Sequence, residues 1–257
     1  MKKARALLAT CAALVFAVGL AGVGHAITNG QLDGNLHPYV GLVDNGVFTC
    51  SGAALSSTVV VTAAHCLWPW QAGGSGPVNV TFDTDASGTP RFYAGTIYTN
   101  PDWCIACQHG VPGFDTHDIA VVVLDDTGVS LAEYAVLPTE GLVDTLPMKT
   151  ALTVVGYGYQ GYSRGGGKPA PMKDFKRYYA ATELVASENR KSDEYLKLTA
   201  NPAQGKGGVC IGDSGGPALL GNVVLGITSY LPNSECVGVT YSNRLDLQYA
   251  LDFVNGF

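Results

Sequence analysis

Three short stretches of the sequence contain residues that together could activate a serine hydroxyl as a nucleophile. "VVVTAAHC" contains His65, "HDIAVVVL" has Asp118 at the head of an apolar run, and "CIGDSGGP" holds Ser214 between glycines. A serine nucleophile needs a base to take its proton, and the base needs a carboxylate to fix its tautomer. Flexible glycines allow backbone N–H groups to turn toward an oxyanion. The three residues therefore make up one set of acyl-transfer groups.

Each residue has an ordinary structural interpretation when it is taken alone. His65 lies beside Cys66 and could simply be packed against a disulfide, and Asp118 could cap a strand or a turn. "GDSGGP" could be a glycine-rich turn. The joint occurrence of all three, in the order His–Asp–Ser, favours the catalytic interpretation.

The elements that must position these residues are mostly short β-strands. β-branched runs recur between Gly, Pro, Asn and Asp, which predicts an all-β sandwich or barrel. Only "LDLQYALDFVNGF" at 245–257 has apolar residues at helical spacing, so we expect one C-terminal helix there. Two stretches, 156–171 and 187–207, are predicted to be long exposed loops. The predicted strands are 59–62, 119–124, 152–155 and 223–229.

The first 26 residues have the three parts of an export signal. A basic start precedes an apolar run from Ala6 to about Val23, and small residues lead up to a cut between Ala26 and Ile27. A retained membrane-spanning helix is the alternative, but no basic stop-transfer cluster follows the run. Cleavage would leave 231 residues and change the formal charge from −6 to −9, because three basic residues are lost. This acidic balance argues against nucleic-acid binding.

Six cysteines remain after such a cut, an even number that predicts three disulfides in an exported chain. A zinc site is the alternative, because "CIAC" places Cys104 and Cys107 at ligand spacing, with His109 and His117 nearby. No second Cys or His pair lies at a zinc-like distance, so we expect no metal and no cofactor. The "DTDASG" segment at 83–88 is interpreted as a turn, because its twelfth position as a calcium loop is Ala94.

Beyond the three motifs, the sequence from "ITNG" to its C-terminal end resembles the secreted serine peptidases of the chymotrypsin/trypsin family, of bacterial type. "CSGAALSSTVVVTAAHC" is similar to the family's Cys–strand–His–Cys block, "GDSGGP" matches its signature, and "VVGYG" and "GITSY" are similar to two of its strands. The order His–Asp–Ser is also that of chymotrypsin. The resemblance implies two packed six-stranded antiparallel β-barrels over 27–257, divided roughly at residue 140, with the active site between them.

The resemblance also implies a role for individual residues. His65 would be the general base, Asp118 its orienting carboxylate and Ser214 the nucleophile, with the N–H groups of Gly212 and Ser214 as the oxyanion hole. The resemblance implies the pairing of four cysteines in two disulfides. The remaining two cysteines have no common family counterpart and would close a local ring. The expected pairs are Cys50–Cys66, Cys210–Cys236 and Cys104–Cys107.

Activation in this family depends on a new α-amino group that pairs with the Asp before the nucleophile. By resemblance these are the amino group of Ile27 and the carboxylate of Asp213. "ITNG" keeps Ile first and Gly fourth but departs from the family pattern between them. Our hypothesis is that removal of residues 1–26 itself creates the active N-terminus. The alternative is that Ile27 merely starts an ordinary strand.

The expected substrate-binding residues are Gly208, Val209, Ser229, Tyr230 and Leu231. Gly208 takes the floor position of the S1 pocket and has no charge, so preference for Arg or Lys is not expected. Leu231 takes a wall position, and the other wall falls within "GVT" at 238–240. We expect cleavage after small or medium apolar residues, with an aromatic preference as the competing prediction.

The sequence thus predicts a secreted, extracellular, monomeric serine endopeptidase that acts on proteins or peptides. A non-catalytic relative that only binds proteins is the first alternative, but no residue of the set is missing. An esterase of the α/β-hydrolase type is the second, since "GDSGG" fits its GxSxG pattern. The His–Asp–Ser order and the lack of alternating strands and helices argue against that fold.

Overall fold

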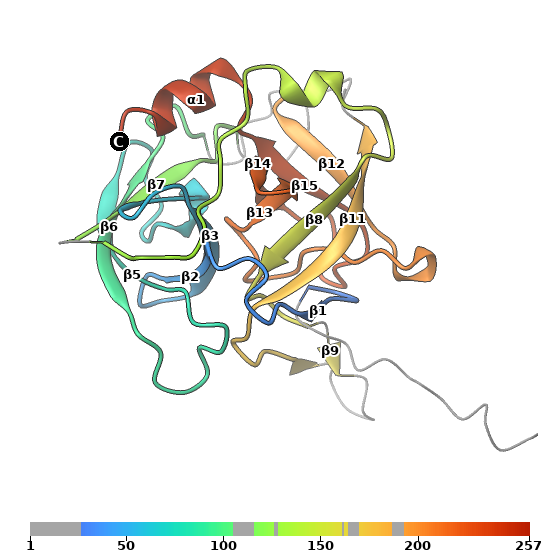
Figure 1. Ribbon diagram of the computed structural model, residues 1–257, viewed down its shortest axis with the longest axis horizontal. Coiled ribbons are helices and arrows are strands. Elements are labelled where there is room, and N and C mark those ends of the chain that lie inside the picture. The colour runs from blue at the N-terminus through green and yellow to red at the C-terminus, as the bar shows by residue number, and fades with distance from the viewer. Residues whose placement is uncertain (1–26, 105–115, 126–127, 161, 164–169, 187–192) are drawn as a thin grey trace, which may run out of the picture.

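Two antiparallel β-barrels lie side by side in the computed structural model, with one α-helix at the C-terminus (Figure 1). The structure describes residues 27–104, 116–125, 128–160, 162–163, 170–186 and 193–257. The predicted signal segment 1–26 lies outside these ranges. None of the helices within them is long and apolar enough to span a membrane.

The first barrel is a closed ring of six strands that holds the predicted base and its carboxylate at one end. Its strands are short and rich in valine and alanine, as expected for a fully buried sheet interior. In spatial order they are β2 (Val40–Asp44), β3 (Thr49–Ala54), β4 (Val59–Thr62), β7 (Ala120–Leu124), β6 (Tyr93–Thr99) and β5 (Ser75–Thr81).

The second barrel is also closed, because β8 pairs with both β11 and β13. The two-residue strand β1, which pairs with β11, and a small β9–β10 hairpin lie outside this ring. The ring is β8 (Ala151–Gly156), β11 (Tyr178–Ala186), β12 (Tyr195–Ala200), β15 (Gly238–Arg244), β14 (Val223–Tyr230) and β13 (Pro217–Leu220); outside it are β1 (Gln31–Leu32), β9 (Tyr162–Ser163) and β10 (Ala170–Pro171). The prediction of two six-stranded antiparallel barrels is confirmed.

Helical structure in the described ranges is limited to one α-helix and three single 3-10 turns. The α-helix, α1 (Gln248–Val254), falls inside the predicted segment 245–257. It buries Ala250 and Val254 in the core of the first barrel, although it follows the last strand of the second. The C-terminal helix therefore ties the two barrels together. The 3-10 turns are η1 (Ala64–Cys66), η2 (Leu142–Thr145) and η3 (Pro202–Gln204).

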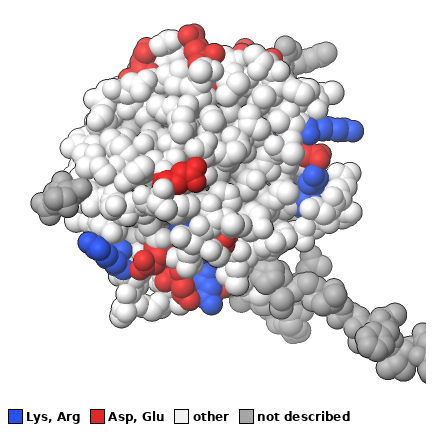
Figure 2. Space-filling view, in the orientation of Figure 1, with Lys and Arg blue, Asp and Glu red and all other residues white. Residues whose placement is uncertain are grey.

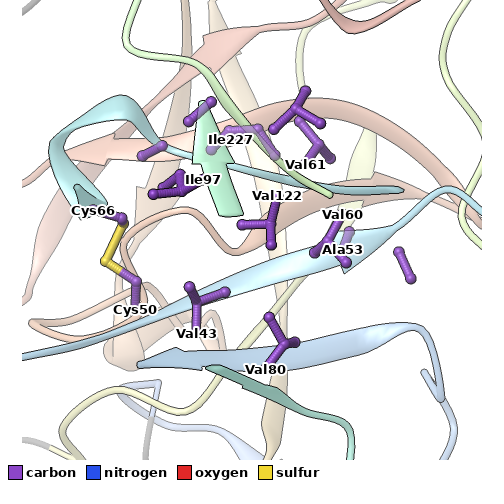
Figure 3. Close-up of a cluster of buried hydrophobic side chains, with 14 of the residues drawn as sticks. Val43, Cys50, Ala53, Val60, Val61, Cys66, Val80, Ile97, Val122 and Ile227 are labelled. Carbon is purple, nitrogen blue, oxygen red and sulfur yellow. A yellow bond between two sulfur atoms is a disulfide. The ribbon is translucent and has the colours of Figure 1, made fainter. Parts of the chain in front are cut away.

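Branched aliphatic side chains fill the first barrel, as Figure 3 shows for Val43, Val60, Val80 and Val122. The Cys50–Cys66 disulfide joins β3 to the turn that follows β4, at the edge of this cluster. Burying a side chain of this size contributes about 1.5–3 kcal/mol, so the barrel supplies a rigid base for the loops at its end. The segment that carries His65 starts from this rigid base.

One of the two predicted loops is only partly a loop. Within 187–207 the chain forms β12, whose half-buried Lys197 and Thr199 alternate with buried Leu196 and Leu198. The sequence did not indicate this strand, because the polar residues on one of its faces follow a charged stretch and look like a continuation of it. Much of the second predicted loop, 156–171, lies outside the described residues.

Charged side chains on the face seen in Figure 2 form small separated groups, with one acidic group near the centre and the others toward the edges. Lysines and arginines stand at the lower and right-hand edges of this view and form no continuous basic band there. At the predicted turn in 83–88, the Asp85 carboxylate accepts hydrogen bonds from the backbone N–H and the hydroxyl of Ser87. This local pairing is typical of a turn.

Candidate active site

The pairing of β4 with β7 brings His65 and Asp118 together. Thr62 lies opposite Ala120 in this antiparallel ladder, so the residues that follow Thr62 run alongside those that precede Ala120. The Asp118 carboxylate accepts a 2.9 Å hydrogen bond from the backbone N–H of His65. Its second oxygen lies 2.7 Å from His65 Nδ1. Two segments 53 residues apart therefore form one ion-pair site at the end of the first barrel.

Asp118 is completely buried and ionised. Burial alone would raise its pKa, but attraction to His65 and hydrogen bonds from His65 and Ser229 outweigh that effect and lower it. An ionised carboxylate only accepts hydrogen bonds, so His65 Nδ1 carries the proton and Nε2 is the basic nitrogen. The carboxylate thus selects the tautomer that a general base requires.

The second barrel completes the surroundings of Asp118. The Ser229 hydroxyl on β14 donates to Asp118 Oδ2 at 2.5 Å, and the side-chain oxygen of Asn243 on β15 accepts from the Asp118 N–H at 2.8 Å. Ser229 was predicted to bind substrate, and its hydroxyl contacts the carboxylate, so any substrate contact would come from other atoms of this residue. Asn243 was not predicted, because an asparagine inside a strand gives no recognisable sequence signal.

Ser214 lies on a tight glycine turn between the two barrels. Its carbonyl accepts from the Ser51 N–H of β3 at 2.7 Å, and the Gly215 N–H donates to Thr228 of β14 at 2.8 Å. Gly215 has φ +77°, and a Cβ there would lie 2.1 Å from the Thr62 hydroxyl. Only glycine fits this position. The glycines of the motif therefore allow Ser214 to sit against the end of β4, next to the His65 turn.

The carboxylate of Asp213 points away from Ser214 into the second barrel. It accepts hydrogen bonds from the N–H groups of Gly158 at 2.7 Å and Cys210 at 2.8 Å. Gly158 is required for this contact, because a Cβ there would lie 2.6 Å from the carboxylate. Among the described residues no cation forms an ion pair with Asp213, and burial raises its pKa to about 7.

Ile27, the predicted partner of Asp213, is fully buried in the cluster that also contains Val209. Thr28 follows it and exchanges two backbone hydrogen bonds with Gly208. Ile27 has φ +56°, a left-handed conformation that is strained for a β-branched residue. The start of the described chain is therefore paired with the residues that lead into the Asp213 turn.

The remaining predicted substrate-binding residues differ in how deeply they are buried and in which residues they contact. A Cβ on Gly208 would lie 2.2 Å from Ala200 and 3.7 Å from the Thr240 methyl group, so Thr240 is the residue of "GVT" that faces the glycine. Val209 is buried in the core of the second barrel, and half-buried Leu231 packs against that core. Tyr230 is half-buried at the end of β14.

His65 and Ser214 both line a cavity of about 520 Å³. The other described lining residues come from the turn between β2 and β3, from the start of β3, from the segment after η1, and from the segments on either side of the β9–β10 hairpin and just before Ser214. They are Val47, Phe48, Thr49, Cys50, Trp70, Tyr159, Lys173, Phe175, Ile211 and Gly212. The predicted base, nucleophile and one oxyanion donor thus meet at one solvent-accessible hollow.

Comparison with known proteins identifies the family. Residues 27–247 match the family model described as Trypsin. The chain belongs to the trypsin family of serine endopeptidases. The human heparin binding protein has the same fold, with a TM-score of 0.62, 18% identity, and coverage of 89% of this chain and 95% of that one.

Trypsin-family relatives of this chain come from insects. Serine protease SP24D of Anopheles gambiae is 27% identical over 82% of this chain and 73% of its own length. Trypsin delta of Drosophila melanogaster is 26% identical over 79% of this chain and 75% of its own length. These relatives do not support the bacterial type that was expected from the leader.

The cysteines of this trypsin-family chain form disulfides between Cys50 and Cys66 and between Cys210 and Cys236. Cys104 is also disulfide-bonded, while Cys107, its expected partner, lies outside the described residues. The two sulfurs of the first disulfide and His65 form the one His/Cys group in the described ranges that is compact enough for a metal. Both sulfurs are oxidised, so they are not the thiolate ligands that zinc requires.

The buried Asp213 should make the uncut chain less stable as the pH rises. A carboxyl group with a raised folded-state pKa stabilises the fold below its unfolded pKa, and this contribution is lost as the pH passes the folded pKa. Its pKa rises from 3.8 to about 7. The expected loss between pH 4 and pH 7 is at most about 4 kcal/mol.

Urea unfolding of a chain that begins at Gly24 and carries Ser214→Ala measures this loss without self-cleavage. The same chain with Asp213→Asn is the control, because it cannot titrate at this position. Between pH 4 and pH 7 we expect the free energy of unfolding to fall more for the chain with Asp213 than for the Asn variant. The Asn variant should therefore be relatively more stable at pH 7. A difference that stays constant with pH would contradict the assignment.

Proposed function

We propose that the chain is an active serine endopeptidase in which Ser214 is the nucleophile, His65 the general base and Asp118 the residue that orients His65. The observation that carries the proposal is the 2.7 Å contact between His65 Nδ1 and buried, ionised Asp118 at a cavity shared with Ser214. This arrangement leaves Nε2 as the nitrogen that takes the hydroxyl proton.

The reaction then follows from these positions. The Ser214 oxygen attacks the substrate carbonyl as His65 takes its proton, and the N–H groups of Gly212 and Ser214 stabilise the resulting oxyanion. The protonated His65 gives its proton to the leaving amine when the peptide bond breaks. A water molecule, deprotonated by the same histidine, hydrolyses the acyl-enzyme and restores the serine.

Activation by a cut before Ile27 is part of the proposal, together with export of the chain. Two observations support it. The Asp213 carboxylate is buried without a cation in the described structure, so a nearby α-amino group would compensate its charge. The φ angle of Ile27 is defined by the preceding peptide group, so cleavage there removes the strained torsion, a relief on the order of 1–3 kcal/mol.

For substrate preference we propose cleavage after small or medium apolar residues. Gly208 has no charge, and Ala200 and the Thr240 methyl group restrict the space next to it. Leu231 supplies a further apolar wall at the end of β14. Long basic side chains would find neither a counter-charge nor enough depth there.

A peptide series that differs only at the residue before the scissile bond tests this preference. We expect kcat/KM for Ala, Val or Leu to exceed that for Arg or Lys by at least about 100-fold, since a buried cation without a partner is strongly disfavoured. Thr240→Ala should raise the Phe-to-Ala ratio, while Thr153→Ala on β8, which removes the same atoms elsewhere, should not. Cleavage restricted to Arg or Lys would refute the proposal.

A further inference from the structure

The cavity lined by Ser214 and His65 is formed by particular elements of the fold. Its described walls come from the first barrel, from Tyr159, Lys173 and Phe175, and from residues 211–214. None of its described lining residues belongs to β14 or β15, the strands that carry Ser229–Leu231 and Thr240. The described walls of the cavity are therefore formed by other elements than the strands that carry the S1 residues proposed above.

A peptide that passes Ser214 has two halves on opposite sides of the scissile bond. The acyl half ends in the side chain that enters the S1 pocket, next to β14. The half that departs as the amine extends away from the S1 pocket, and the cavity is a hollow at Ser214 whose described walls belong to other elements. The lining residues of the cavity are thus placed to contact the leaving-group half of the substrate.

Among the described residues that line this cavity, Lys173 is the one lysine or arginine. Lys173 Nζ lies 4.5 Å from the ring centre of Phe175 and 5.4 Å from that of Tyr159, and it donates to the Thr49 hydroxyl. A Cβ on Gly212 would lie 3.7 Å from it, which places the ammonium group beside the proposed oxyanion donor.

The Lys173 ammonium group is partly desolvated and has spare bonding capacity. Burial lowers its pKa, against the opposing attraction of Asp213 and Asp44. In the described part of the chain it forms no ion pair within 4.0 Å, and its one hydrogen bond to a side chain uses one of three N–H groups. A carboxylate that enters the cavity would therefore meet a cation held by aromatic rings, with N–H groups still able to donate.

We propose that Lys173 makes this peptidase prefer substrates that carry a carboxylate within about three residues after the scissile bond. The inference rests on the proposed function, because it assigns a substrate class to the same site. The carboxylate can come from an Asp or Glu side chain or from the C-terminus of a short substrate. Trp70 and Phe48, which line the same cavity, provide the apolar surface for the intervening residues.

The overall charge of the protein opposes binding of acidic peptides. This long-range effect can be separated from the local effect of Lys173 in the cavity. The chain that begins at Ile27 has a formal net charge of −9, so acidic peptides are repelled at long range. Removing any one lysine increases that repulsion equally. Lys176, which pairs with Asp85 at 3.6 Å and does not line the cavity, therefore offers a control of identical charge change.

The test uses internally quenched peptides with one apolar sequence before the scissile bond. In one set, Glu replaces Gln at each of the first three positions after it, with the C-terminus amidated. In the other set, Gln peptides of decreasing length have either a free or an amidated C-terminus. We expect kcat/KM to rise at least about tenfold for the carboxylate partner in at least one matched pair.

Lys173→Met should reduce that ratio to about one, while Lys173→Arg and Lys176→Met should keep it. A preference in the amidated set assigns the side chain as the source, and a preference for the free acid assigns the C-terminus. A ratio near one in both sets, or a ratio that survives Lys173→Met, would overturn the inference. Failure of the wild type to cut any peptide would instead count against the proposed function.

Discussion

Asp118→Asn should lower kcat by about 10⁴-fold and leave the fold intact, as expected when a triad carboxylate is replaced by an amide. The amide is nearly isosteric, so it fills the same buried space between His65 and Ser229. Its NH₂ group can donate but cannot accept from His65 Nδ1. The imidazole would then carry its proton on Nε2, facing Ser214, and could not act as a base.

Asp118→Asn should lower kcat without the change in KM that a general disturbance of the site would cause. KM should change little, because Asp118 is completely buried and does not reach the cavity. Ser229→Ala is the matched control, because it removes one hydrogen bond from the same carboxylate but leaves its charge. We expect Ser229→Ala to lower kcat far less than Asp118→Asn does. Equal losses for both variants, or unchanged kcat for Asp118→Asn, would show that the carboxylate does not orient the base.

A single extra residue before Ile27 should reduce kcat/KM on the order of 10³-fold. With Ala26 retained, Ile27 has a peptide nitrogen in place of a charged amine. The Asp213 carboxylate then lacks the proposed cation, and the adjoining Gly212–Ser214 turn loses the interaction that would hold its N–H groups toward an oxyanion. The strained φ of Ile27 also remains.

Two chains of equal purity test this activation step, one beginning at Ile27 and one at Ala26. Kinetics should be paired with a stability measurement, because the chain that begins at Ile27 should also lose the pH-dependent destabilisation of Asp213. Asp213→Asn in the Ile27 chain should reproduce the low activity of the Ala26 chain. If the Ala26 chain proves as active as the Ile27 chain, the N-terminus plays no part in forming the site.

The parts of the site that could be predicted from sequence are those with short-range signals. "GDSGGP" and "TAAHC" have fixed spacings that reflect turns and a disulfide, so His65 and Ser214 could be identified without coordinates. Asp118 was identifiable because it directly precedes an apolar strand. The C-terminal helix was visible in its 3.6-residue periodicity, although the sequence did not show that it packs against the first barrel.

Other features depend on contacts between distant segments and leave no local pattern. Lys173 follows a Gly- and Pro-rich stretch, and only the fold reveals that its ammonium group lies beside Gly212. The hydrogen bond from the Ser229 hydroxyl to Asp118 joins the two barrels, and no sequence pattern indicated it. The identity of the residue facing Gly208 was ambiguous, since a strand register cannot be counted reliably across a loop containing Cys236.

The central claim, that Ser214 is a nucleophile activated by His65, can be tested by labelling with a fluorophosphonate. The chain that begins at Ile27 and its Ser214→Ala variant are incubated with the reagent, and the modified residue is mapped by mass spectrometry. We predict stoichiometric phosphonylation of Ser214, loss of peptide cleavage in proportion to labelling, and neither labelling nor cleavage for the variant. Peptide cleavage that persists after Ser214→Ala, or a label on another residue, would contradict the account.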